Sequence, residues 1–226
     1  MGFYKILQIF LLKKFKIGLL DYRLNTLGNN PELIEILLKI QKEHKTLQSL
    51  AELYNIYKLS EQTKHLDGDI AEVGVYKGGS AKLIAINKGK RNLHLFDSFE
   101  GILTVSKSLD ILRREQFKDT SLKEVKKCLS GFDNIFFHKG WFPVTAKSVK
   151  DQKFSFIHLD VDLYQSTLDA LDFFYDRMNR GGVILSHDYN SIICPGVKKA
   201  FDKFFNHKEE IIIELAGTTQ CLVVKL

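Results

Sequence analysis

The sequence has few of the features that mark several large classes of protein. Its three cysteines, an odd number, show neither a CxxC pair nor the spacing of metal ligands, which argues against a disulfide framework or a zinc site. We expect ordinary thiols in a reducing cytoplasm. The net charge of +6 is modest and spread along the chain, without a block of interleaved arginine and aromatic residues, so nothing supports nucleic-acid binding. Internal repeats and low-complexity tracts are also missing.

No uninterrupted apolar run reaches the length of a membrane span. Residues 1–20 are strongly apolar, but they carry four lysines and no small-residue cleavage site, so we expect neither a transmembrane helix nor a secretory signal. Two interpretations of this segment stay open. It is a helix that docks on the domain or on a homodimer partner, or it is a basic amphipathic helix on the inner face of a membrane. The expected location is cytoplasmic in both cases, with peripheral membrane contact in the second.

The 226 residues, of which 45% are hydrophobic, suffice for one domain with a sizeable core and a short appendage. Apolar periodicity after a cap-like Asn30 predicts a helix over residues 31–59. Strands and helices then alternate. We expect strands at 70–75, 92–96, 134–138, 154–159 and 183–186, and helices at 80–87, 121–129, 166–178 and 196–205. Two β-rich runs, 210–215 and 220–225, are close enough to form an antiparallel hairpin.

This alternation, with strands that are apolar on both sides, predicts an α/β domain built on a doubly wound, mostly parallel sheet covered on both faces. With the terminal hairpin the sheet has seven strands. We therefore divide the chain into an N-terminal helical extension, residues 1–60, and an α/β domain, residues 61–226.

The most informative segment is residues 69–80, DIAEVGVYKGGS. An apolar strand ends in Glu72, and a turn with Gly74 and Gly78 leads into a helix, which brings the backbone close to a ligand or to another part of the chain. A second strand ends in Asp97, 25 residues after Glu72, at about the distance where an acid holds a ribose hydroxyl in dinucleotide-binding folds. The pattern favours an adenosine-type cofactor over a purely structural glycine turn.

The third strand end carries Gly140 and Trp141. The glycine would allow a close approach, and the tryptophan could form a wall against an adenine ring or could belong to the core. Residues 101–117, of mixed polarity, are long enough for a lid beside such a site.

The fourth and fifth strand ends carry acids. Asp160 and Asp162 flank one apolar residue, and His187 and Asp188 follow the next strand. Asp160 and Asp188 could bind a hard divalent cation through oxygen. His187 could be a softer ligand that favours Mn, Fe or Zn, or it could be a general base. The alternative for each acid is that it caps the helix that follows.

Four segments resemble the macrocin O-methyltransferase family: EVGVYKGGSA, LFDSFEG, FIHLDVDLYQSTLDAL and RGGVILSHDY. The resemblance covers about residues 67–205. It implies a Rossmann-like class I methyltransferase fold in residues 61–226, S-adenosylmethionine as the methyl donor, and a divalent metal, usually magnesium, that positions a sugar diol. His187 stands where the family usually has an acid.

The resemblance gives the candidate residues their roles. The cofactor-binding set is Glu72, Gly74, Tyr76, Gly78, Ser80, Asp97, Ser98, Gly140, Trp141 and Asp160. The metal set is Asp160, Asp188 and His187. The catalytic set is Asp160 and His187, either of which would remove the proton of the acceptor.

The predicted function is metal-assisted methylation of a hydroxyl on a sugar-containing small molecule or a glycolipid. A catechol-type methyltransferase on the same scaffold is the main alternative. A nicotinamide oxidoreductase would need a closer G-x-G-x-x-G turn, and it would leave the acids unexplained. A non-catalytic, membrane-associated scaffold is the remaining alternative.

Overall fold

The computed structural model describes residues 30–44, 46–102, 110–111 and 116–226. The chain divides into two compact units, residues 1–39 and 40–226. In the first, the Asn30 side chain accepts the Leu33 N–H at 3.0 Å and so caps helix α2 (Pro31–His44), as the sequence predicts. The predictions for residues 1–20 and most of the predicted lid lie outside the described residues. Among the described residues, no helix has the length and apolarity to cross a membrane.

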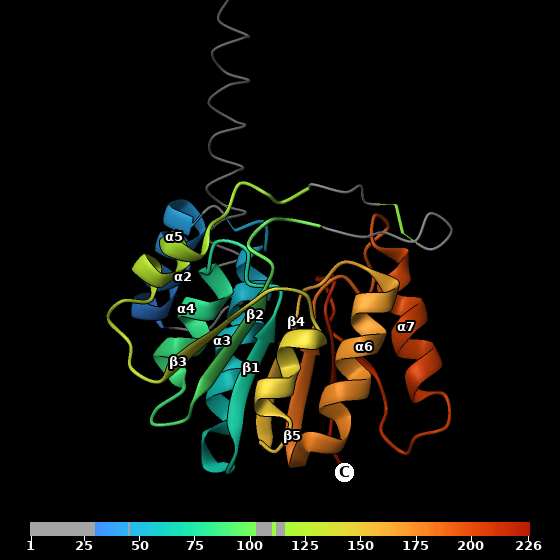
Figure 1. The fold of residues 1–226 in the computed structure, drawn as a ribbon. Coiled ribbons are helices and arrows are strands. Elements are labelled where there is room, and N and C mark those ends of the chain that lie inside the picture. Colours follow the sequence, from blue (N-terminus) through green and yellow to red (C-terminus); the bar gives the residue numbers. More distant parts are fainter. Residues whose placement is uncertain (1–29, 45, 103–109, 112–115) are drawn as a thin grey trace, which may run out of the picture. The chain divides into compact units, whose positions relative to one another are not determined.

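The second unit contains the predicted seven-stranded sheet (Figure 1). Its order is β3-β2-β1-β4-β5-β7-β6, and β5–β7 and β7–β6 are the antiparallel pairs. The strands are β1 (Asp69–Val73), β2 (Leu93–Asp97), β3 (Ile135–Lys139), β4 (Phe154–Leu159), β5 (Met178–Ser186), β6 (Ile213–Glu214) and β7 (Cys221–Val224). The predicted doubly wound fold with a C-terminal antiparallel hairpin is confirmed, and it is the class I methyltransferase sheet.

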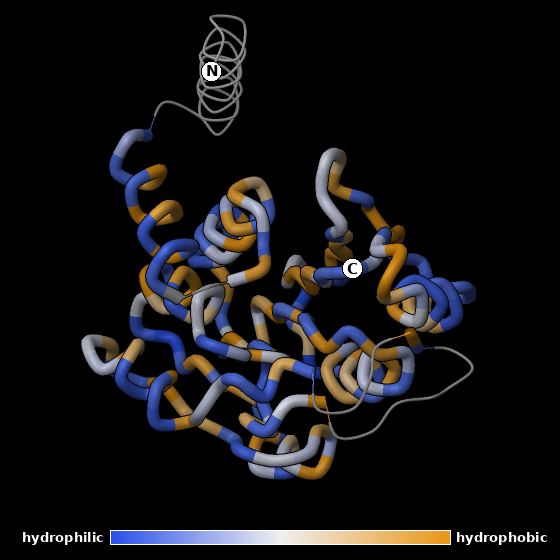
Figure 2. The backbone as a smooth tube through the Cα atoms, turned by 90° about the horizontal axis from the view of Figure 1, so that it is seen from above, coloured by the Kyte–Doolittle hydropathy of each residue, from blue (hydrophilic) through white to orange (hydrophobic). Residues whose placement is uncertain are grey.

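Helices cover both faces of this sheet (Figure 1). Helices α6 (Tyr164–Phe174) and α7 (Pro195–Phe205) pack together on one face, and α3 (Leu50–Gln62) and α4 (Gly79–Asn87) pack together on the other. A short helix, α5 (Leu122–Cys128), precedes β3. Hydrophobic and hydrophilic residues alternate along the helical coils, as expected for elements with one buried side (Figure 2). Strand β4 is buried along its whole length, which explains its mostly apolar sequence.

The predicted helix over residues 31–59 is wrong in one respect, because it is interrupted. Helix α2 ends at His44 and α3 begins at Leu50. Ser49 starts α3 with a capping box: its hydroxyl accepts the Glu52 N–H at 3.3 Å, and the Glu52 carboxylate accepts the Ser49 N–H at 2.8 Å. Helix α3, which we assigned to the N-terminal extension, is part of the second compact unit.

A partly buried ion pair joins Lys225, near the end of the chain, to Glu210 in the loop before β6. The Glu210 carboxylate accepts a hydrogen bond from the Tyr175 hydroxyl at 2.8 Å and lies 2.5 Å from Lys225 Nζ. Burial alone would raise the pKa of Glu210, but Lys225 and Tyr175 lower it to about 2.

This pair predicts a pH-dependent contribution to stability. Because the pKa of Glu210 is lower in the folded protein, its contribution is present above pH ~4.5 and is lost as the pH falls toward 2. Glu210→Gln should lower the free energy of unfolding by about 1–3 kcal/mol at pH 7. Urea unfolding at several pH values should show the difference from the unmodified protein shrinking below pH ~4.5. A constant difference across that range would contradict the prediction.

Candidate active site

A cavity of about 430 Å³ lies at the carboxyl ends of the five parallel strands. Its lining comes from the ends of β1 to β5 and from the segment before and at the start of α3. Open parallel sheets bind ligands at this edge, and the volume is that of a small-molecule site. Of the predicted site residues the lining includes Gly74, Tyr76, Ser80, Asp97, Ser98, Gly140, Trp141, Asp160, His187 and Asp188.

The glycine turn after β1 has two separate roles. Gly74 has a φ of +86°, and a Cβ there would lie 1.8 Å from the backbone oxygen of Asp160, so this glycine lets the ends of β1 and β4 pack against each other. Gly78 has a φ of +82° and stands at the N-cap of α4, which turns Gly79 and Ser80 toward the cavity. Gly74 is therefore needed for close packing of the chain against itself. The turn at Gly78 leaves the start of α4 open to a ligand.

Asp97 joins the ends of β1 and β2. Its Oδ2 accepts the N–H groups of Val75 at 2.7 Å and Tyr76 at 2.9 Å, and its Oδ1 accepts the N–H of Phe99 at 2.6 Å. The carboxylate also lines the cavity. It therefore fixes the shape of the turn, a role that spacing alone did not reveal, while its contact with a ribose stays a prediction. The neighbouring Ser98 hydroxyl donates to the Gly101 carbonyl at 2.9 Å.

Glu72 lies outside the cavity lining and is completely buried. Its Oε1 is 2.8 Å from Nδ1 of His158, which is also completely buried. Burial raises the pKa of Glu72, and the His158 contact opposes that shift. In the described residues Glu72 thus pairs with a core histidine, and the cofactor contact expected for it stays a prediction.

Aromatic side chains form part of the cavity wall. Trp141 is 37% exposed and lines the cavity, so it is not a core residue. The rings of Tyr76 and Phe117 pack edge to face, with 5.8 Å between their centroids. The Tyr76 hydroxyl donates a hydrogen bond to the Asp119 carboxylate at 2.8 Å. Flat apolar walls of this kind suit an adenine ring.

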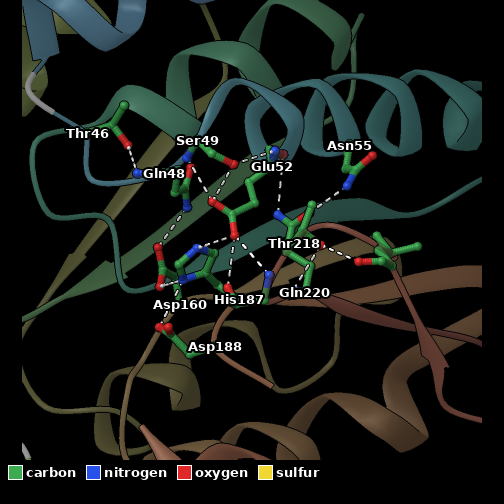
Figure 3. A network of polar contacts seen from close by, with 12 residues as sticks. Thr46, Gln48, Ser49, Glu52, Asn55, Asp160, His187, Asp188, Thr218 and Gln220 are labelled. Atoms are coloured by element: carbon green, nitrogen blue, oxygen red, sulfur yellow. Dashed lines mark hydrogen bonds and ion pairs between the residues drawn. The ribbon is translucent and has the colours of Figure 1, made fainter. Parts of the chain in front are cut away.

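His187 lies among three carboxylates (Figure 3). Its Nδ1 is 2.9 Å from Asp188 Oδ2 and 3.2 Å from Asp160 Oδ1. On the other side of the ring, Nε2 is 3.5 Å from Glu52 Oε1. The sequence predicts the first two neighbours, because β4 and β5 are adjacent. Glu52 was not predicted.

These contacts fix the charges of the cluster. Burial alone would lower the pKa of His187, but the carboxylates, Asp160 foremost, raise it far above its usual value. Burial would raise the pKa of Asp160, and the opposite charge of His187 instead lowers it. Asp162 differs, because burial and the charges of Asp160 and Asp188 raise its pKa well above the usual value. At neutral pH, without a metal, His187 is therefore a cation and Asp160 is ionised.

The donor atoms of His187, Asp160 and Asp188 fit a divalent metal. They lie within 4.8 Å of one another, and two of the separations, 2.9 and 3.2 Å, are close to the ~3 Å between adjacent ligands of an octahedral ion with ~2.1 Å bonds. A second group, Asp162, Asp188 and Cys194, fits less well. Its Cys194 thiol is a soft donor that suits a hard divalent cation poorly, and burial raises the pKa of this thiol, so that it holds a proton, as His187 does.

Sequence reasoning missed two residues of this site, Gln48 and Glu52. Both line the cavity, and Gln48 Nε2 donates to Asp160 Oδ2 at 2.8 Å. The motif Ser49-x-x-Glu52 was a readable helix-start signal. It does not reveal that the helix start lies against strand ends more than 100 residues further along the chain.

Comparisons with known proteins identify relatives of the whole fold. The sequence model of a family described as Macrocin-O-methyltransferase (TylF) matches residues 45–218. Demethyldecarbamoylnovobiocin O-methyltransferase from Streptomyces niveus is 28% identical over an alignment of 188 positions, and the match covers 74% of this chain and 71% of that protein. The 8-demethyl-8-(2,3-dimethoxy-alpha-L-rhamnosyl)-tetracenomycin-C 4'-O-methyltransferase from Streptomyces olivaceus is 32% identical over an alignment of 143 positions, and the match covers 56% of this chain and 55% of that protein. The solved structure of the O-methyltransferase NovP has a TM-score of 0.68 and 25% identity, and the match covers 78% of this chain and 80% of NovP.

Proposed function

The chain belongs to the macrocin O-methyltransferase family and is an S-adenosylmethionine-dependent O-methyltransferase, and we propose that it methylates a hydroxyl of a sugar or glycosylated metabolite with the help of a divalent metal. The observation that carries this proposal is the joint presence, in one cavity, of the glycine turn after β1 and the carboxylates after β4 and β5. A sugar acceptor is supported by the Streptomyces olivaceus relative, whose name describes a rhamnosyl compound.

When bound, S-adenosylmethionine supplies a methyl group on a good leaving group, and a metal held by Asp160, His187 and Asp188 would lower the pKa of the acceptor hydroxyl. The protein must align the acceptor oxygen and remove one proton. Of the two catalytic candidates, only Asp160 is free to accept a proton, because its carboxylate is ionised while His187 already carries a proton. His187 would then support the reaction through its position and its charge and not as the base.

The cofactor would occupy the part of the cavity between the turn at Gly78–Ser80 and the wall at Trp141. Tyr76, Asp97 and Ser98 lie in the lining between these two ends of the proposed site. This arrangement leaves the carboxylates of β4 and β5 for the methyl acceptor.

Family membership sets aside the oxidoreductase and scaffold alternatives. Four possibilities stay predictions: a catechol-type acceptor, a glycolipid acceptor, contact with a membrane, and a homodimer. The last two depend on residues 1–20, which lie outside the described residues.

Calorimetric titration of S-adenosylmethionine into the protein tests the cofactor site. We expect micromolar binding, about −8 kcal/mol, and about tenfold weaker binding for Trp141→Ala, since an aromatic contact contributes about 0.5–1.5 kcal/mol. Val144→Ala, at a 60% exposed position on the next turn, is the matched control and should leave the affinity unchanged. Methyl transfer to rhamnosides and to catechols then distinguishes the acceptors. Transfer to catechols alone would refute the sugar proposal.

A further inference from the structure

The start of helix α3 brings a fixed carboxylate to the far side of the His187 ring. Glu52 Oε1 accepts hydrogen bonds from the Thr219 N–H at 3.1 Å and the Thr219 hydroxyl at 2.9 Å. Its Oε2 accepts the Ser49 N–H and hydroxyl, both at 2.8 Å. The side chain is therefore held from two directions, by its own helix start and by the turn between β6 and β7 (Figure 3).

This anchoring determines which nitrogen of His187 faces the strand ends. Glu52 Oε1 lies 3.5 Å from Nε2, which is an ion-pair contact and not a hydrogen bond, because Nε2 has no hydrogen-bond partner among the described residues. Nδ1 is then the nitrogen between Asp160 and Asp188, and it is free to act as a ligand once a metal displaces its proton. Proteins usually orient a ligating histidine with a carboxylate beside its second nitrogen, and Glu52 is the carboxylate in that position here.

Gln48 gives a second, independent indication of a ligand. Its side chain is 4% exposed and lines the cavity. The amide nitrogen is occupied by Asp160, which fixes the orientation of the group, and Oε1 has no hydrogen-bond partner among the described residues. A buried oxygen without a partner costs about 1–3 kcal/mol, so it indicates a donor that arrives with a ligand, such as a metal-bound water or the acceptor hydroxyl.

We propose that Glu52 is a positioning residue that holds His187 as the nitrogen ligand of the metal, and that this nitrogen makes the site prefer Mn²⁺ to Mg²⁺. The inference rests on the metal in the proposed function. Mg²⁺ prefers oxygen ligands in a near-ideal octahedron, whereas affinity for an imidazole nitrogen increases from Mn²⁺ along the first transition row. The donor set of one nitrogen and two carboxylates therefore favours the transition metal.

The experiment measures metal binding without S-adenosylmethionine or acceptor. Mn²⁺ is titrated into the full chain while the signal of the free ion is followed by electron paramagnetic resonance, and Mg²⁺ is then added as a competitor. Spin-echo modulation from ¹⁴N reports a nitrogen ligand directly. We expect this modulation in the unmodified protein and its loss in His187→Asp, together with a fall of the Mn²⁺/Mg²⁺ preference on the order of tenfold.

Glu52→Gln tests the positioning role. It should weaken Mn²⁺ binding about 10- to 100-fold in the unmodified background but by less than about twofold in the His187→Asp background, because the effect passes through the ring. Ser49→Ala is the matched control. It removes the cap and lowers the melting temperature, yet it leaves the contacts of Glu52 Oε1 in place and should retain the ¹⁴N modulation.

Three results would overturn the proposal. These are no ¹⁴N modulation in the unmodified protein, an equal effect of Glu52→Gln in both backgrounds, or the same metal preference with and without His187. Calorimetry with S-adenosylmethionine on the same samples separates this failure from failure of the proposed function, since cofactor binding does not need the nitrogen ligand.

Discussion

Asp160→Ala should lower the rate of methyl transfer about 1,000-fold while changing the affinity for S-adenosylmethionine by less than about threefold. General-base catalysis contributes about 10²- to 10⁴-fold, and Asp160 is the ionised carboxylate at the centre of the polar network. The substitution also removes the partner of Gln48 Nε2 and one of the carboxylates beside His187. Single-turnover kinetics and calorimetry measure the two quantities separately.

Asp160→Asn separates charge from shape in the same experiment. Asparagine keeps the size of the side chain but cannot accept the proton of the substrate, so it should lose nearly as much rate as alanine. Asp172→Ala, on the exposed side of α6, is the control and should be unchanged. A parallel loss of rate, cofactor affinity and melting temperature in both Asp160 variants would mean that this residue supports the fold and not the reaction.

The fold could be predicted because its signals are local. The strand β4 is a mostly apolar run followed by acids, and helical periodicity fills the intervals between it and the other parallel strands. The C-terminal hairpin was marked by two β-rich runs around a short turn. In a parallel sheet all such strand ends meet at one edge, so the proximity of Asp160, His187 and Asp188 followed from the fold without side-chain detail.

What could not be predicted depends on contacts between distant parts of the chain. Gln48 meets Asp160 across 112 positions, and Glu52 meets Thr219 across 167. The predicted helix ran through Ser49 without a break, because the helical spacing of apolar residues indicates a buried face but does not mark where a helix ends. Asp97 is a second example. Its spacing in the sequence fits a ribose contact, but that spacing does not indicate that its carboxylate accepts three backbone N–H groups.

Gly74→Ala should destabilise the fold by about 4 kcal/mol or more. The new Cβ would lie 1.8 Å from the carbonyl oxygen of Asp160, which is backbone and cannot rotate away, and the φ of +86° adds strain for any residue with a side chain. Gly89→Ala is the control, because Gly89 also has a positive φ of +61° but no atom within 4 Å of its would-be Cβ. That variant should lose only about 1–2 kcal/mol in urea unfolding.

Equal losses for the two alanine variants would show that the ends of β1 and β4 can separate at little cost. We expect the opposite, and with a consequence for activity. The oxygen that Gly74 accommodates belongs to Asp160, so we expect the relaxation that makes room for a methyl group to move the backbone of the proposed proton acceptor. A displacement of about 1 Å is enough to cost about 100-fold in rate. The folded fraction of Gly74→Ala should therefore be far less active per molecule than that of Gly89→Ala. Gly74 would then affect the reaction through the packing of β1 against β4.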